Sequence, residues 1–281
     1  MAHANYHEDY VLTPRDSREQ RAIRSGYTGP KNNRGEPDTT GTDKIGIMIY
    51  PPYSNYKHYS GQWRNGEFNG QGTVIFKNDD TYTGGWNDSE LNGRGVYKHS
   101  NGYVREGEFV DDLQVRGTVV RPDYTFQGTF LSGREHTGTT TYTNGSVFTG
   151  RREQEDMKRV GTFKYPDGDI FSGTFEVQNG FWVLHGDDAE MIVNSLPCKF
   201  IYKGQMRNGK MHGNGTIQIM SGPRYSARFD KDVEVEGSRE NLPKQGGTRH
   251  KRTRCRHKKL RMSRRYEQKG WGVIAKSVRE W

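Results

Sequence analysis

Hydrophobic residues are scarce in this sequence. They make up 30% of its 281 residues, which is low for a globular protein. No apolar run approaches the roughly 18 residues that span a membrane. Residues 1–5 have neither the basic nor the apolar segment of a secretory signal. We therefore expect neither a membrane span nor secretion.

Cysteine is also rare, because the chain contains only Cys198 and Cys255. Two cysteines cannot form the disulfide framework of a small secreted domain. The sequence therefore predicts an intracellular protein in a reducing compartment, either the cytoplasm or the nucleus.

Signatures of catalysis and of metal binding are missing as well. His250, Cys255 and His257 lie close together, but the paired ligands of a zinc finger are absent. The segment 185–188 (His-Gly-Asp-Asp) has no partner motif and is predicted to be a polar turn. The chain has no nucleophile elbow and no set of kinase motifs. We predict no catalytic residue, no metal site, no cofactor and no small-molecule substrate.

Glycine and aromatic residues, by contrast, are plentiful. The chain contains 36 glycines, and aromatic residues make up 12% of it. Disordered chains are poor in aromatics. The combination therefore predicts a folded core in which rings pack over bare backbone.

A repeat accounts for this composition. Tyr59-Ser60-Gly61-Gln62-Trp63 recurs 23 residues later as Tyr82-Thr83-Gly84-Gly85-Trp86. Related segments begin at Arg105, Phe126, Phe148, Phe171, Tyr202 and Tyr225. A second half-motif follows each start, as Gly-x-Gly at 70–72, 93–95 and 213–215, or as a single glycine at Gly117, Gly138, Gly161 and Gly186.

This pattern, Y-x-G-x-W-x-x-G-x-x-x-G-x-G, resembles the MORN repeat (membrane occupation and recognition nexus) over roughly residues 45–230. The resemblance implies a rigid scaffold that holds other proteins, often at cytoskeletal or membrane-associated structures. Some MORN proteins carry a SET-type methyltransferase or a lipid kinase after their repeats. The roughly fifty residues that follow the last repeat here are too few for either domain, so we expect a protein that is not an enzyme.

Strand geometry gives the repeat a physical meaning. Alternate residues of a strand share a face, so Tyr59, Gly61 and Trp63 point the same way. The opposite face carries threonines at one recurring place: Thr73, Thr118, Thr139, Thr162 and Thr216. Asn-Gly and Asp-Gly pairs, which favour tight hairpin turns, precede several repeat starts. The predicted core of the repeats contains Tyr59, Gly61, Trp63, Tyr82, Gly84, Trp86, Phe109, Phe130 and Phe175.

These patterns predict an all-β fold, an elongated single antiparallel meander of β-hairpins followed by a short C-terminal helix. Residues 1–44 are predicted to be a flexible segment, and residues 45–236 a sheet of about seven to eight repeats. Residues 46–50 are expected to cover the edge of the first hairpin. The sheet has an insert at 178–201, which we interpret as a loop folded back on the sheet, with a binding knob as the alternative. The fifth repeat has arginines and acids at 151–156 in place of an aromatic residue, and its first strand is expected to be short.

Basic charge is concentrated in the C-terminal segment 237–281. Between 249 and 265 lie ten Lys or Arg and no acid, whereas the rest of the chain has 33 basic and 34 acidic residues. Such a run is typical of polyanion binding or of nuclear import. The predicted polyanion-binding residues are Arg249, Lys251, Arg252, Arg254, Arg256, Lys258, Lys259, Arg261, Arg264 and Arg265.

An apolar stripe follows the basic run. Trp271, Ile274, Val278 and Trp281 have the spacing of one helix face. We predict that this stripe docks on a partner or on a membrane.

The sequence leaves several functions open. The first is a scaffold for protein–protein interactions, with exposed Tyr and Trp beside Arg and Lys at its interfaces. For the C-terminal segment the favoured partner is nucleic acid or the nuclear-import machinery. The main alternative is a peripheral membrane protein that binds phosphoinositides through this segment. A docking role for another protein and an inert solubilising segment are the remaining options. The expected locations are therefore the cytoplasm or the nucleus, with association with a membrane or the cytoskeleton as a further option.

Overall fold

The computed structural model describes residues 26–153, 157–178, 181–196, 199–220 and 222–243. The regular elements in these ranges are β-strands. The chain divides into two units, residues 1–136 and 137–281, and each is described by itself. The predicted C-terminal helix falls outside the described residues.

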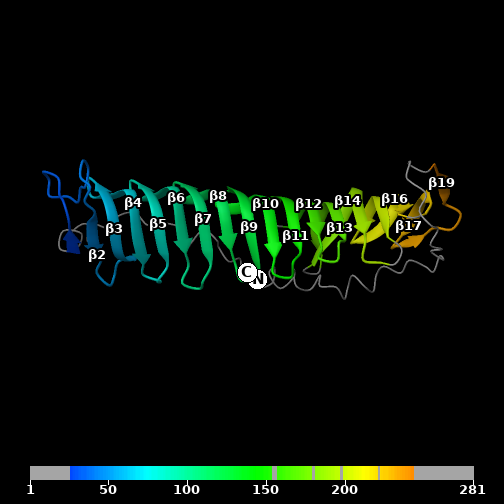
Figure 1. Cartoon of the computed structure of the whole chain (residues 1–281), viewed down its shortest axis with the longest axis horizontal. Coiled ribbons are helices and arrows are strands. Elements are labelled where there is room, and N and C mark those ends of the chain that lie inside the picture. Colours follow the sequence, from blue (N-terminus) through cyan, green and yellow to red (C-terminus); the bar gives the residue numbers. More distant parts are fainter. Residues whose placement is uncertain (1–25, 154–156, 179–180, 197–198, 221, 244–281) are drawn as a thin grey trace. The chain divides into compact units, whose positions relative to one another are not determined.

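The first unit is an antiparallel meander in which each strand pairs with the next one along the chain (Figure 1). Its strands are β1 (Tyr27–Thr28), β2 (Gly46–Ile49), β3 (Tyr56–Arg64), β4 (Glu67–Phe76), β5 (Thr81–Asn87), β6 (Glu90–Lys98), β7 (Val104–Val110), β8 (Leu113–Val120) and β9 (Tyr124–Leu131). β10 (Arg134–Tyr142) begins in this unit and ends in the second. The predicted hairpin repeat is confirmed here.

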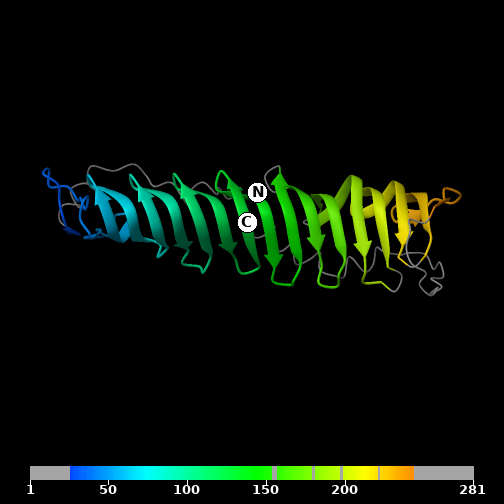
Figure 2. The ribbon, with the colours of Figure 1, turned by 45° about the horizontal axis from the view of Figure 1, so that its top comes forward.

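The second unit continues the same order of antiparallel pairing (Figure 2). Its strands after β10 are β11 (Val147–Glu153), β12 (Lys158–Lys164), β13 (Ile170–Gln178), β14 (Phe181–Val193), β15 (Phe200–Arg207), β16 (Lys210–Ile219), β17 (Arg224–Asp230), β18 (Val233–Glu234) and β19 (Glu240–Leu242). At its C-terminal end β17 pairs with both β18 and β19. The fold is therefore all-β, as predicted.

A stacked pair of rings shows that the strands bend sharply. Phe68 is paired with Trp63, which lies four residues from Tyr59 along β3. In a flat sheet that separation is about 13 Å. The rings of Tyr59 and Phe68 nevertheless stack with centroids 3.7 Å apart. The rings therefore lean toward each other over a strand pair that bends towards its aromatic face, and this face packs against itself.

Glycines and a β-bulge produce this bend. Gly61 faces Gly72 across β3 and β4, and the register shifts between Gly61 and Trp63. Bulges increase local twist and bend a strand. A β-carbon on Gly72 would collide with the ring and hydroxyl of Tyr59, which lie directly over it. The same arrangement recurs at Gly84 and Gly95 under Tyr82.

The residues predicted to form the repeat core lie inside this bend. Gly61 and Gly84 are buried. The predicted aromatic side chains are at most 8% exposed: Tyr59, Trp63, Tyr82, Trp86, Phe109, Phe130 and Phe175. The aromatic–glycine face is therefore the structural core.

Two-residue turns close the hairpins at one end. Asn65 and Gly66 both have positive φ (49° and 85°), which is the conformation of a type I′ turn. Positive φ at both positions recurs in Asp88-Ser89, Asp111-Asp112, Ser132-Gly133, Asn208-Gly209 and Lys231-Asp232. Only the Asn-Gly members of this set carry the usual sequence signal.

Tyr27 and Thr39, within the segment 1–44 predicted to be flexible, pack against the first hairpin. The ring of Tyr27 meets that of Trp63 edge to face, with centroids 5.3 Å apart. Thr39 exchanges hydrogen bonds with the backbone of Trp63, which donates from its N–H to Thr39 Oγ1 at 2.9 Å. These contacts and the pairing of β2 with β3 cover the first hairpin. The edge role expected for residues 46–50 is confirmed by that pairing.

The predicted loop in the insert is wrong. Residues 181–193 form β14, the second strand of the sixth hairpin, paired with β13 and β15. The glycine place opposite Gly204 is filled by Ala189 and not by Gly186, because the register shifts between the two. The first strand of the fifth repeat is not shortened either: β11 has seven residues, as does β5.

Replacing Trp86 by alanine should destabilise the first unit by about 3–5 kcal/mol, because the ring is 3% exposed and its loss leaves a cavity. The control is Tyr53→Ala, since Tyr53 is 67% exposed and should change stability by less than about 0.5 kcal/mol. Chemical denaturation of both full-length variants measures the difference. Equal midpoints would show that the ring face is not the core.

Candidate interaction surface

The face opposite the rings is polar and regular. Thr73 and Thr83 are joined through their hydroxyls at 3.0 Å across β4 and β5. In the second unit Thr139 and Thr149 make the same contact at 3.2 Å. Two of the threonines predicted for this face, Thr73 and Thr139, therefore pair with a threonine of the next strand.

The described residues do not form the rows of exposed Tyr and Trp expected at an interface. The rings of the repeat motif are in the core. Among the exposed large hydrophobic residues of the described ranges, Tyr53 is the only aromatic one. This expectation was wrong because the same rings cannot both fill the bend and face a partner. An interface on the sheet must use other side chains.

The outward-facing pairs beside the type I′ turns differ from one hairpin to the next. In β3–β4 the pair is Arg64 and Glu67, and in β5–β6 it is Asn87 and Glu90. In the second unit the corresponding pairs are Arg207 with Lys210 and Asp230 with Val233. The core of each hairpin is thus repeated, whereas this row of the surface is variable.

In β7–β8 this pair is apolar. Val110 lies opposite Leu113, and their exposed fractions are 43% and 39%. Leu131, at the same place before the next turn, is 63% exposed. A β-carbon at Gly133 would lie 3.3 Å from Leu113 Cδ2, so Leu113 reaches the turn that follows Leu131. These three exposed apolar side chains lie beside two consecutive turns, and we call them the apolar cluster.

A buried arginine fixes the turn beside this cluster. Arg105 occupies the ring position of the third repeat and is 7% exposed. Its Nε donates to Gln114 Oε1 at 2.9 Å, and its Nη2 donates to the carbonyl oxygen of Gly133 at 2.8 Å. Gln114 in turn donates to the Glu106 carbonyl at 3.1 Å. The side chains of the third repeat thereby hold the next turn in place.

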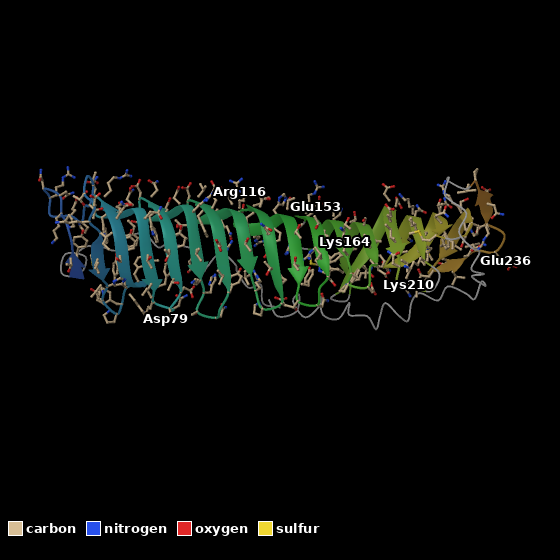
Figure 3. The ribbon with its side chains drawn as sticks, in the orientation of Figure 1. Asp79, Arg116, Glu153, Lys164, Lys210 and Glu236 are labelled. Carbon is tan, nitrogen blue, oxygen red and sulfur yellow. The ribbon has the colours of Figure 1, made fainter. Side chains whose placement is uncertain are left out.

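Acidic residues border the apolar cluster. Asp112 is in the turn of β7–β8, and its Oδ1 accepts a hydrogen bond from the backbone N–H of Leu91 at 2.8 Å. Burial, with Glu90 and Asp111 close by, raises the pKa of Asp112 to about 6. Glu90 and Asp111 are exposed. The hairpin ends that carry Val110, Leu113 and Leu131 therefore have exposed acidic side chains beside the apolar ones. Arg116, on β8, projects from the ribbon and is paired with Glu108 (Figure 3).

The second unit has a polar hollow on its surface. It is shallow and open, with a volume of about 530 Å³. Its lining includes Lys203, Asn214, Thr216, Arg228, Ser238 and Glu240. The mixture of both charges and small polar groups does not select one ligand chemistry.

A buried carboxylate near the first hairpins has a structural role. Asp80 is 4% exposed and accepts hydrogen bonds from the Tyr97 hydroxyl at 3.0 Å and from the Ser100 N–H at 2.8 Å. His99 Nδ1 lies 3.1 Å from the same carboxylate. These contacts tie the start of β5 to the chain that leaves β6.

The predicted binding residues of the C-terminal segment, from Arg249 to Arg265, lie outside the described residues. The same holds for the stripe of Trp271, Ile274, Val278 and Trp281. Within the described residues, no three His, Cys, Asp or Glu side chains are grouped as metal ligands would be. In that part of the chain no helix has the length and apolar character needed to cross a membrane.

The repeated antiparallel hairpins, each closed over its own rings, define a β-hairpin repeat protein. The model of the MORN repeat matches residues 59–81, 82–102 and 202–223. The chain therefore contains MORN repeats. The matched segments are hairpins with tyrosine at the start, whereas the unmatched third repeat has Arg105 there. A comparison with curated proteins found no match.

Asp112→Asn should stabilise the protein near neutral pH by about 1 kcal/mol, because it removes a partly buried charge. Asparagine tolerates the positive φ of 67°, and its side-chain oxygen can still accept the hydrogen bond from the backbone N–H of Leu91. Since the folded pKa is raised, the unfolded state loses its proton first as pH rises. Wild-type stability should then fall between about pH 4 and about pH 6, and the variant should lack this loss.

Thermal unfolding of both proteins across this pH range measures the effect. Asp43→Asn, at an exposed aspartate, is the control and should leave the pH profile unchanged. An Asp112→Asn protein that is less stable than wild type near neutral pH would contradict the prediction.

Proposed function

We propose that this chain is a non-enzymatic scaffold whose repeat sheets bind other proteins and whose basic C-terminal run binds a polyanion. The observation that carries the scaffold role is the contrast between a repeated core and a variable surface. The ring–glycine core recurs in hairpins whose outward pairs are charged, polar or apolar in turn. Repeat proteins bind partners through such extended surfaces. MORN repeats are in general non-enzymatic scaffold segments.

The uneven charge of the chain supports the second part of the proposal. Ten cations lie within residues 249–265, whereas the remaining sequence has 33 basic and 34 acidic residues. The repeats therefore offer a polyanion little net attraction. The basic run can neutralise phosphates and release their counterions, which is the main source of affinity in non-specific nucleic-acid binding. We favour nucleic acid, or the acidic receptor of a nuclear-import signal, as the partner.

Only one aromatic residue, Tyr266, directly adjoins the basic run. Base stacking needs several aromatic platforms. We therefore expect binding that depends on charge and has little sequence preference.

Neutralising the ten basic residues of 249–265 by glutamine in the full-length chain should weaken binding to a mixed-sequence single-stranded oligonucleotide at least about a hundredfold. Wild-type affinity should fall steeply with salt, with a log–log slope that approaches about −7 if all ten cations engage. Fluorescence anisotropy over a salt series measures both quantities. The control replaces three exposed cations of the sheets, Arg64, Arg116 and Lys203, by glutamine and should change affinity within about threefold.

Equal binding by the neutralised variant would overturn the polyanion role of the run. The membrane alternative is tested with anionic vesicles. Insertion of the stripe at 271–281 would shift tryptophan fluorescence to the blue, and oligonucleotide would not. A blue shift on vesicles combined with no oligonucleotide binding would replace our proposal by the membrane role.

The scaffold role is tested separately by affinity capture with wild type and with the neutralised variant. Proteins captured equally by both do not need the basic run, and those still captured when Trp271, Ile274, Val278 and Trp281 are also replaced by alanine belong to the repeat sheets. If the neutralised variant captures nothing, binding by the sheets is refuted.

A further inference from the structure

The exposed apolar cluster of the first unit identifies a specific docking surface. We define the tip patch as Val110, Leu113 and Leu131 together with Glu90 and Asp111. Its apolar members come from three strands, β7, β8 and β9, and face away from the core. Their outward position means that the fold does not require them to be apolar.

Comparison with the neighbouring hairpins strengthens this point. The first two hairpins place Arg64 with Glu67 and Asn87 with Glu90 beside their turns. The hairpin therefore forms equally well with polar residues at this place. Leucine and valine here leave apolar area in water, a cost that a bound partner removes.

Charge indicates what kind of partner fits. Glu90 and Asp111 lie close to Asp112 in the β7–β8 turn, which joins Val110 to Leu113. The nearest exposed arginine on β8, Arg116, is paired with Glu108. Arg134 follows the next turn, at the opposite end of the patch. A partner therefore meets apolar surface beside negative charge.

We propose that the tip patch binds a basic amphipathic peptide segment of another protein. Its apolar side chains would cover Leu113 and Leu131, and its Lys or Arg residues would face Glu90 and Asp111. This inference rests on the proposed scaffold function and specifies one of its surfaces. A second copy of the chain fits less well, because a two-fold interface at this patch brings like charges together.

The patch is also held in a fixed shape. Arg105 ties the turn after Leu131 to Gln114 of β8, and Leu91 and Asp112 join β6 to the β7–β8 turn. Each outward side chain thus stands on a hydrogen-bonded strand or turn. A preformed surface loses little entropy on binding, which favours affinity.

The test uses a designed peptide of about 18 residues with leucines on one helical face and lysines elsewhere. A second peptide with glutamate in place of lysine controls for charge. Both are titrated against the full-length chain by fluorescence anisotropy. We expect the lysine peptide to bind and the glutamate peptide to bind at least about tenfold more weakly.

Leu113→Thr combined with Leu131→Thr should weaken binding of the lysine peptide at least about tenfold, because the apolar contact is lost. Glu90→Gln combined with Asp111→Asn should weaken it about threefold or more and reduce its salt dependence. The matched control is Val233→Thr. Val233 occupies the register place of Leu113 in the last hairpin and is 62% exposed, but the turn residue before it, Asp232, has the cation Lys210 close by. This variant should bind within about twofold of wild type.

Circular dichroism and melting temperature must first show that all variants fold as wild type does. If the Leu113→Thr, Leu131→Thr protein does not fold, Val110→Thr and Val110→Leu are tested in its place. Only Val110→Thr should then weaken binding. Equal binding of both peptides, or equal binding by the patch variants, overturns the inference. So does a wild-type dimer that these substitutions dissociate, because the patch would then bind a second copy. If the patch variants capture the same proteins as wild type does, the scaffold function is supported but the role of the tip patch in it is refuted.

Discussion

The ring of Tyr59 lies over the bare backbone of Gly72, and most of the architecture depends on contacts of this kind. Glycine at this place leaves room for the ring, because a β-carbon there would collide with it. The bulge after Gly61 then turns the strand, so that Tyr59 stacks on Phe68 at 3.7 Å. A single sheet can in this way bury an aromatic face that would otherwise need a second layer to cover it.

This internal core separates stability from binding. Because the rings of a hairpin pack against those of its neighbours, the opposite face is not constrained by packing. The core can also hold a side chain that is not aromatic, provided that this side chain packs on a ring. Arg159, for example, is buried with its guanidinium 4.2 Å from the centroid of the Trp182 ring, and it donates to the Tyr142 hydroxyl at 2.8 Å. Cation–π contact and hydrogen bonding offset the burial of its charge.

Much of the fold follows from local patterns. The parity of Tyr59, Gly61 and Trp63 correctly assigned the buried face, and the Asn-Gly and Asp-Gly pairs before several repeat starts correctly marked turns. The pattern failed where geometry depends on neighbours. Asp111-Asp112 forms a type I′ turn like that of Asn65-Gly66 but without glycine, since contacts with the preceding hairpin stabilise its positive φ. Ala189 takes a glycine place because a bulge shifts β14, which no spacing rule reveals.

The sequence alone determined the period, the hairpins, the ring–glycine face and the separation of basic charge into residues 249–265. These properties depend on residues close together in the chain, where strand parity and turn chemistry are local rules. Only the tertiary structure decided that Val110, Leu113 and Leu131 form one exposed cluster beside Glu90 and Asp111. That grouping depends on the pairing of separate strands and on the arginine that holds a turn, and neither follows from residue spacing.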